Sequence, residues 1–148
     1  MLTKREFEAL SDFRYQLRRF LRFSENAVSR EGVTELQYLL LLHIKGYPGR
    51  EWATIGELAE RLQAHHHGTV ALISRCEQLG LVKRKTSTQD RRRVEIRLTA
   101  KGERSVGRLA VLHRDQIRSI RGKLVPARMR PSRARVGRAP KSVPQRTP

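Results

Sequence analysis

The chain contains one cysteine in 148 residues, which excludes an internal disulfide framework. It also lacks an apolar run of transmembrane length and a recognisable N-terminal signal peptide, so neither a membrane span nor secretion is expected. Acidic residues are scarce: 14 stand against 32 lysines and arginines, and the formal net charge is +18. A chain this basic favours a polyanionic partner, and we expect nucleic acid rather than an anionic membrane surface. We therefore expect a cytoplasmic protein.

Catalytic motifs are missing as well. The sequence shows no catalytic triad, no phosphate-cradling glycine loop and no carboxylate dyad, so an enzyme is not expected. The cluster His65-His66-His67 invites interpretation as a metal site. Successive side chains on a helix point about 100° apart, however, so three adjacent histidines do not easily converge on one ion. We expect no metal ion and no other cofactor.

Proline is nearly absent before residue 126 and frequent after it, since five of the six prolines lie between Pro126 and Pro148. The same region has no apolar period, and residues 123–148 carry eight basic residues and no acidic one. Such a composition cannot form a packed core. We therefore predict a folded domain over residues 1–125, long enough for one hydrophobic core, and a disordered basic tail over residues 126–148.

Two long amphipathic helices are expected at the ends of the folded domain. The first opens with the capping box Thr3-x-x-Glu6 and extends over about residues 4–29. The second follows Thr99 and extends to about Leu124, with an apolar stripe close to a heptad repeat. Each stripe is larger than one small lobe can cover, so we expect both helices to form a dimer interface. The predicted dimerisation residues are Leu10, Phe13, Leu17, Leu109, His113, Ile117 and Ile120.

The segment between these helices begins with a capping box, Thr34-x-x-Gln37. The helix that follows is apolar nearly all round, which is typical of a central, buried helix. After a turn at residues 46–49, Trp52-Ala53 is expected to form a short strand that pairs with a later hairpin.

Residues 54–99 give the most informative pattern in the chain. A short helix starts at the capping box Thr54-x-x-Glu57, a polar turn follows at residues 64–68, and a second helix runs towards Gly80, a typical C-cap residue. Two strands then enclose a polar loop with a dense basic tip, and residues 83–97 hold seven basic residues. Helix, turn, helix and basic hairpin is the arrangement of a winged-helix DNA-binding domain.

Three pieces of this segment together resemble the MarR family of bacterial transcription regulators. They are the frame of Val70, Ile73, Cys76-Glu77 and Gly80-Leu81-Val82, the hairpin signature Asp90-Arg91-Arg92, and Leu98-Thr99-x-x-Gly102. The resemblance extends from about Phe7 to Leu124 when the flanking helices are included. It implies a mainly α, winged helix-turn-helix fold with a small β-hairpin wing, long N- and C-terminal dimerisation helices and a DNA-binding lobe at about residues 34–99.

The resemblance also implies a function. Members of the family are homodimers that bind pseudo-palindromic operator DNA, usually as repressors released by a small ligand or by oxidation. By the same resemblance, Asp90 orients a neighbouring arginine through an ion pair. The family usually continues with a further amphipathic helix that completes the dimer, and residues 126–148 depart from that pattern. We therefore expect a weaker dimer than is typical of the family.

The candidate DNA contacts lie on the second helix of the pair and on the wing. The recognition helix is expected over His66–Leu79, with Val70, Ile73 and Cys76 facing the core. The start of such a helix reaches base edges, and Arg75 can bind guanine or a phosphate, or pair with an acid of the chain instead. Arginines at the wing tip can enter the minor groove or form a solvated charge run. The predicted DNA-binding residues are His66, His67, Thr69, Leu72, Arg75, Lys83, Arg84, Arg91, Arg92 and Arg93.

Three alternatives stay open. The rival function is a non-specific nucleic-acid-binding architectural protein, in which the basic wing and tail supply the affinity. Cys76 could be a redox sensor, although its apolar slot favours an inert core residue. A small-molecule effector is a possible further partner. The residues that could line its pocket, for which we favour packing roles, are Tyr15, Tyr38, His43, Trp52 and His113.

Overall fold

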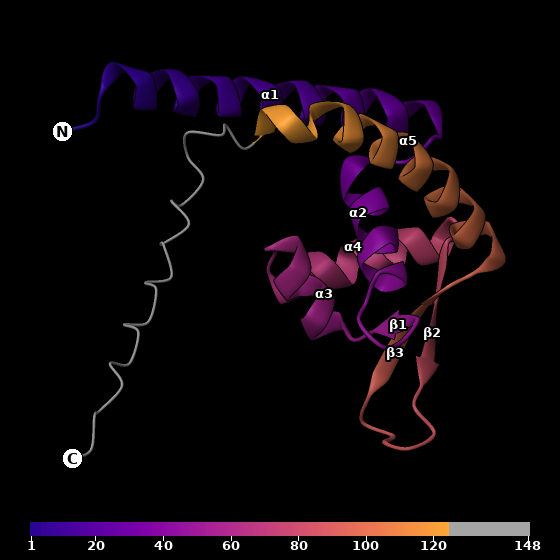
Figure 1. Cartoon of the computed structure of the whole chain (residues 1–148). Helices are drawn as coiled ribbons and strands as arrows, with labels where there is room; N and C mark the ends of the chain where they lie inside the picture. The colour runs from indigo at the N-terminus through magenta and orange to yellow at the C-terminus, as the bar shows by residue number, and fades with distance from the viewer. Residues whose placement is uncertain (125–148) are drawn as a thin grey trace, which may run out of the picture.

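The computed structural model describes residues 1–124, and the tail predicted at residues 126–148 lies outside the described residues. Two long helices lie along one side of the molecule, a lobe of shorter elements lies along the other, and the first half of α1 extends beyond the lobe (Figure 1). The predicted fold class, mainly α with a small β-hairpin, is confirmed. The elements are α1 (Lys4–Arg30), α2 (Glu35–Lys45), β1 (Trp52–Ala53), α3 (Ile55–Leu62), α4 (His66–Gln78), β2 (Val82–Thr86), β3 (Val94–Leu98) and α5 (Ala100–Leu124).

The helix starts follow the capping motifs of the sequence. All three predicted capping boxes form, at the N-termini of α1, α2 and α3, with the threonine hydroxyl and the third-position side chain each accepting a backbone N–H. Thr99 caps α5, because the Gly102 N–H donates to its hydroxyl oxygen (3.1 Å). The recognition helix α4 differs from the others: its N-cap residue, His65, makes no side-chain cap hydrogen bond.

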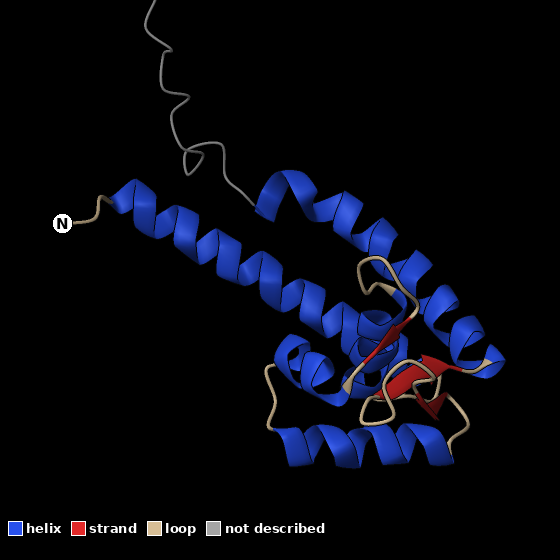
Figure 2. Cartoon of the chain, turned by 90° about the horizontal axis from the view of Figure 1, so that it is seen from below, coloured by secondary structure: helices blue, strands red, loops and turns tan. Residues whose placement is uncertain are grey.

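The three strands form one antiparallel sheet in the order β1-β3-β2. Trp52 lies opposite Arg97 and Ala53 opposite Ile96, so the predicted pairing of this short strand with the hairpin is confirmed. In the view of Figure 2 the sheet lies beside the helices of the lobe, and α1 leads away from it. The short strand β1 therefore joins the base of the wing to the helical part of the lobe.

The centre of the fold is α2, as its apolar sequence predicts. Leu40, Leu41 and Ile44 are fully buried there. The surrounding core residues come from every other helix and from the sheet, so a single core holds the lobe and α5 together. Examples from the other elements are Val28, Leu58, Ile73, Ile96 and Leu109.

The start of α5 is tightly joined to the turn that follows α4. The Thr99 N–H donates to the Leu81 carbonyl oxygen (3.0 Å) and the Thr99 hydroxyl to that of Gly80 (2.6 Å). A Cβ added at Gly102 would lie far inside van der Waals distance of the Leu81 carbonyl oxygen. The motif Leu98-Thr99-x-x-Gly102 is thereby explained, since the threonine binds the turn and the glycine leaves room for it.

A buried polar cluster joins α1, α2 and α5. His113 is 5% exposed, and its Nδ1–H donates to the Leu109 carbonyl oxygen (2.7 Å). Its Nε2 lies 2.7 Å from the Ser24 hydroxyl oxygen, which lies 2.7 Å from the Glu35 carboxylate. The imidazole stacks on Tyr38 with 4.5 Å between ring centroids. One side chain therefore fixes the two long helices against α2.

This packing corrects part of the predicted dimer interface. Leu109, His113 and Ile120 are buried within their own chain, because α1 and α2 cover that side of α5. Ile117 remains 45% exposed, and Leu10 is also exposed. On α1, Phe13 and Leu17 are half-buried. The apolar period correctly indicated a buried face, but the element that buries it belongs to the same chain.

Candidate nucleic-acid interface

The outer face of α4 presents the first group of candidate contacts. His66, His67 and Arg75 are exposed, as are Gly68 and Ala71 between them. Arg75 forms no ion pair within residues 1–124, since Glu77 pairs with Arg84 and Glu103 with Lys45. The alternative in which an acid of the described chain neutralises Arg75 is therefore wrong. This guanidinium can donate to a base edge or a phosphate.

Two residues predicted on this face lie on the opposite one. Thr69 is 1% exposed and Leu72 is 9% exposed, so neither reaches the surface that would meet DNA. The buried stripe of α4 runs through Thr69, Leu72, Ile73 and Cys76, whereas Val70 is only half-buried. The buried hydroxyl of Thr69 has a hydrogen-bond partner, because it donates to the His65 carbonyl oxygen (3.1 Å). The predicted contacts at Thr69 and Leu72 are corrected accordingly.

The basic residues of the wing divide into two groups. Lys83, Arg91 and Arg92 are exposed, and their charges are available to a ligand. Arg84 instead turns towards α4, where it pairs with Glu77 and donates to the Ser74 hydroxyl (3.0 Å). The guanidinium of Arg93 also turns inward. Arg84 and Arg93 are therefore structural residues of the lobe, which corrects their assignment as direct contacts.

The charge at the base of the wing is partly neutralised by one carboxylate. Glu95 pairs with Arg97 (2.8 Å) and lies 3.6 Å from Arg93. The hydrogen bond from Arg97 lowers the pKa of Glu95, so this carboxylate stays ionised beside the two guanidiniums. The exposed positive charge of the wing therefore lies on Arg91 and Arg92 at its tip and on Lys83 and Lys85 of β2.

Asp90 has a different role from the one implied by the family resemblance. Its carboxylate Oδ1 accepts the backbone N–H of Arg92 (3.0 Å). It forms no ion pair with an arginine in the part of the chain that the structure describes. Asp90 therefore shapes the turn at the wing tip through the backbone, a role typical of aspartate in tight turns.

Cys76 behaves as a core residue. It is fully buried on the inner side of α4, and burial raises the pKa of its thiol to about 11. Since the thiolate is the reactive form, this thiol is protected from oxidation by both access and ionisation. The structure supports the core interpretation over the redox sensor.

The remaining histidine and aromatic candidates do not converge. The rings of His65 and His67 stack with 5.9 Å between centroids, and within residues 1–124 no group of three or more His, Cys, Asp or Glu residues could hold a metal ion. The five residues considered for an effector pocket are scattered as well. Tyr38 and His113 lie in the core, and His43 is half-buried on α2. Trp52 lies at the base of the wing, and Tyr15 lies on α1.

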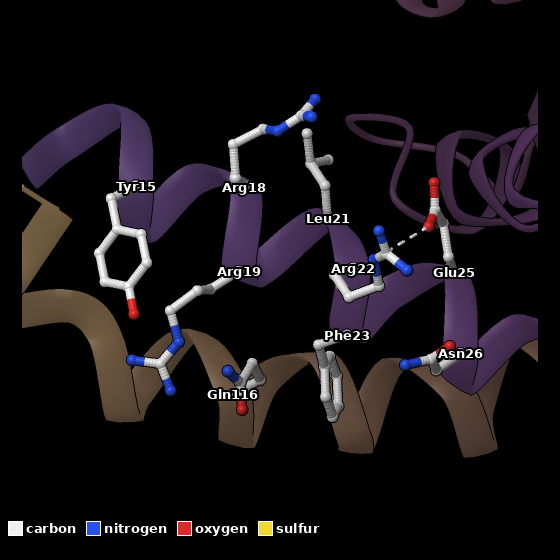
Figure 3. Close-up of a pocket in the computed structure, with 9 residues that line it drawn as sticks. All are labelled: Tyr15, Arg18, Arg19, Leu21, Arg22, Phe23, Glu25, Asn26 and Gln116. Carbon is white, nitrogen blue, oxygen red and sulfur yellow. Dashed lines mark ion pairs between the residues drawn. The ribbon is translucent and has the colours of Figure 1, made fainter. Parts of the chain in front are cut away.

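A groove lies along α1, with a volume of about 630 Å³. Tyr15 and Arg19 point from α1 towards α5, whose Gln116 also lines the groove, and Arg22 pairs with Glu25 (Figure 3). Of the residues proposed for an effector pocket, Tyr15 lines this groove.

None of the described helices is both long enough and apolar enough to span a membrane.

Sequence reasoning missed one group of residues at the base of the wing. Arg50 and Arg97 lie near the Trp52 ring, and Arg61 lies over Tyr47. The available signal was the single tryptophan on a short strand, with an arginine two residues before it. That signal does not indicate a stacking partner distant in sequence.

The fold and the site together define a class. The second helix of the helix-turn-helix has an exposed face, and the hairpin after it carries at its tip two arginines that form no ion pair within residues 1–124. This arrangement is a winged helix-turn-helix domain. The particular family is given by comparison: a family model described as the MarR family matches residues 31–93, which span α2, α3, α4 and most of the wing.

A known transcriptional regulatory protein is similar to this chain. The chain is 32% identical over 110 residues to a Thauera aromatica protein assigned as the transcriptional regulatory protein for the hcr operon. The match covers 73% of this chain and 64% of that protein, so the chain spans less than two thirds of its relative. The resemblance to the MarR family is confirmed.

Solved structures show the same fold. AbsC, a MarR family transcriptional regulator from Streptomyces coelicolor, has a TM-score of 0.67 at 24% identity, with 80% of each chain covered. A MarR family protein from Bacillus stearothermophilus has a TM-score of 0.68 at 24% identity, covering 81% of this chain and 83% of its own. An S. aureus MepR variant bound to an oligodeoxyribonucleotide has a TM-score of 0.62 at 19% identity, covering 85% and 87%.

Proposed function

We propose that this chain is a DNA-binding transcriptional regulator, acting as a repressor, that binds a pseudo-palindromic operator as a homodimer. One observation carries the proposal: Arg75 on α4 and Arg91 and Arg92 at the wing tip are exposed and unpaired within residues 1–124, while the neighbouring arginines are neutralised inside the lobe. The MepR variant, whose structure contains an oligodeoxyribonucleotide on a similar fold, supports the same role. No catalytic activity is part of the proposal, and its site of action is the cytoplasm of a bacterial cell.

In the proposed complex, α4 enters the major groove and the wing follows the backbone to the adjacent minor groove. Arg75 binds a base edge or a phosphate, and the wing-tip arginines enter the minor groove where its negative potential is high. Two copies related by a two-fold axis put their recognition helices about 34 Å apart, one turn of DNA. Occupation of the operator would exclude the polymerase.

The proposed dimer uses the apolar residues that the chain leaves uncovered on its two long helices. A contiguous apolar patch on a protein surface commonly marks an interaction site. A small-molecule effector, if one binds, would act by favouring one spacing of the two lobes over another. The exposed set, which shares Leu10 and Ile117 with the one expected from sequence, is Phe7, Leu10, Tyr15, Leu21, Val111, Leu112 and Ile117.

The rival proposal is non-specific binding through basic charge. Competition with unrelated DNA distinguishes it from operator binding. Selection of DNA from a random pool by the purified full-length chain should yield one pseudo-palindromic motif. Its binding should survive an excess of unrelated DNA, because base contacts add discrimination that phosphate contacts lack. The architectural protein would be favoured if the recovered DNA shared no motif and if excess unrelated DNA abolished binding.

Substitution of Arg92 tests the wing. We expect Arg92→Ala to weaken binding to the selected operator about tenfold, because an exposed guanidinium at the wing tip is lost. Arg118→Ala on α5 removes the same charge from the side of the dimerisation helices and should change the affinity much less. Gel-shift titrations at one fixed salt concentration compare the two variants. Equal losses would contradict the assignment of the wing.

Substitution of Ile117 tests the dimer. Ile117→Glu places a charge on an apolar position of α5 that is exposed in the single chain. We expect this variant to be monomeric, because the proposed dimer would bury an unpaired carboxylate at a high cost in free energy. Ser119→Glu adds the same charge about 200° away around the helix and serves as the control. Sedimentation at micromolar concentration measures both. A monomeric unmodified protein would disprove the dimer and the two-half-site mechanism.

A further inference from the structure

Trp52, the only tryptophan of the chain, lies between the helical lobe and the wing. The guanidinium carbon of Arg50 lies 3.8 Å from the centroid of its ring, and that of Arg93 lies 4.7 Å from the same centroid. Arginines at these distances are attracted to the electron-rich face of an indole. Trp52 thus contacts one arginine that precedes β1 and one that follows the wing tip.

On the lobe side, Arg50 is firmly attached to the start of α3. Its Nε–H donates to the Trp52 carbonyl oxygen (3.1 Å), and its guanidinium pairs with Glu57. Glu57 is itself the capping-box residue of α3, since its carboxylate accepts the Thr54 N–H (2.8 Å). Arg50 also lies over the ring of Tyr47, 4.3 Å from its centroid. On the lobe side, the arginine that covers the indole is therefore held by several contacts.

On the wing side, Arg93 is attached to the turn that carries the exposed arginines. Its Nη2 donates to the Ser87 hydroxyl oxygen (2.9 Å). The same oxygen accepts the backbone N–H groups of Gln89 (3.2 Å) and Asp90 (3.3 Å). Asp90 in turn accepts the N–H of Arg92 (3.0 Å). A continuous set of contacts therefore runs from the indole to the wing tip.

The wing needs such an attachment. A two-stranded hairpin is marginally stable by itself, and the third strand, β1, pairs with only two residues of β3. The Nε of Arg93 is buried without a hydrogen-bond partner in the described part of the chain. The inward position of Arg93 is thus maintained by the Trp52 ring together with Ser87 and Glu95.

We infer that Trp52 is the positioning residue of the wing: by holding Arg93 inward, it fixes the orientation of Arg91 and Arg92 relative to the recognition helix α4. Trp52 acts on DNA only through these residues. The inference rests on the proposed DNA-binding function, but its first test does not require DNA.

The first test measures wing order in the free protein by hydrogen exchange. Trp52→Leu retains an apolar side chain on β1 but removes the indole face. It should accelerate exchange of the Gln89, Asp90 and Arg92 amides about tenfold, and leave the amides of α2 unchanged. Trp52→Phe, which restores a ring face, should recover part of the protection. Unchanged exchange at the wing, or equal acceleration throughout the lobe, would overturn the inference.

A second variant tests the contact between Trp52 and Arg93 by changing the arginine. Arg93→Gln should give the same local acceleration and shift the fluorescence emission of Trp52, the only indole present. The matched control is Lys85→Gln, which removes an exposed charge from β2 and should change neither quantity. This pair decides the inference even if Trp52→Leu fails to fold. An emission spectrum identical in the Arg93 and Lys85 variants would count against it.

The third test is a double-mutant cycle on operator affinity. Arg92→Ala should weaken binding about tenfold in the natural background and about threefold or less in the Trp52→Leu background, because an unpositioned wing no longer uses Arg92 fully. Equal losses in both backgrounds would show that Trp52 does not position the wing. If the natural protein binds no DNA, the proposed function fails, and the exchange and fluorescence measurements still decide the role of Trp52.

Discussion

Replacing Gly102 by alanine should lower the free energy of unfolding by about 3 kcal/mol, since the added methyl group must displace backbone in a packed region. The Cβ would collide with the carbonyl oxygen of Leu81 and lie 3.1 Å from its carbonyl carbon. Neither side of this contact can move freely, because Thr99 binds the same carbonyl group and caps the helix that carries Gly102. Urea denaturation followed by circular dichroism measures the loss.

The same helix supplies a matched control. A Cβ at Gly107 would meet nothing within 4 Å. Gly107→Ala should therefore stabilise the chain by about 1 kcal/mol, the usual gain from replacing glycine inside a helix. Opposite signs for the two substitutions would identify the contact at Leu81 as the cause. If Gly102→Ala were as stable as the natural protein, the close approach of α5 to the turn after α4 would be wrong.

Replacing His113 by alanine should destabilise the chain by about 3 kcal/mol, because a buried ring is lost and polar partners are left unsatisfied. The imidazole stacks on Tyr38 and meets Phe20 and Phe23 edge-on, with 6.0 and 5.7 Å between ring centroids. Ser24→Ala, which keeps the ring, should cost about 1 kcal/mol. Equilibrium unfolding in urea compares these variants.

The control for His113 is His67, which is exposed at the start of α4. His67→Ala should leave stability within about 0.5 kcal/mol of the natural value, as is usual for surface substitutions. A double-mutant cycle between Ser24 and His113 should give a coupling free energy of about 1 kcal/mol or more. Strictly additive effects would show that the 2.7 Å contact between them contributes nothing to the junction.

Elements of the fold were predictable where local chemistry decides them. The threonine capping boxes fixed three helix starts, and the alternation of residues 94–98 identified the second strand of the wing. These signals lie within a few residues of the structure that they determine.

Contacts between distant segments were harder to predict. The stripe through Leu109 and His113 correctly indicated a buried face, but an apolar period does not say whether the covering surface belongs to the same chain or to a second one. On α4, Val70 and Leu72 are both apolar, so composition alone left the rotation of the helix undetermined. The burial of Thr69 depended on a hydroxyl-to-backbone hydrogen bond that hydropathy does not describe.

In the wing, sequence alone also did not show which arginines are exposed. Arg91, Arg92 and Arg93 are identical in sequence chemistry, yet the first two are exposed and the third lies against Trp52. The difference arises because Arg93 directly precedes β3, where Glu95, Ser87 and the indole surround its side chain. A run of like residues can therefore hold two different roles.

The attachment of α5 has a mechanical consequence for any response to a ligand. Its start is hydrogen-bonded to the turn after α4, and its middle is held to α1 and α2 by His113, so these contacts oppose bending between α5 and the lobe. The distance between two recognition helices would then be set by the contact between chains and not by bending within one. Changing the preferred spacing of half-sites would require redesign of the uncovered surfaces of α1 and α5, leaving the DNA-binding lobe untouched.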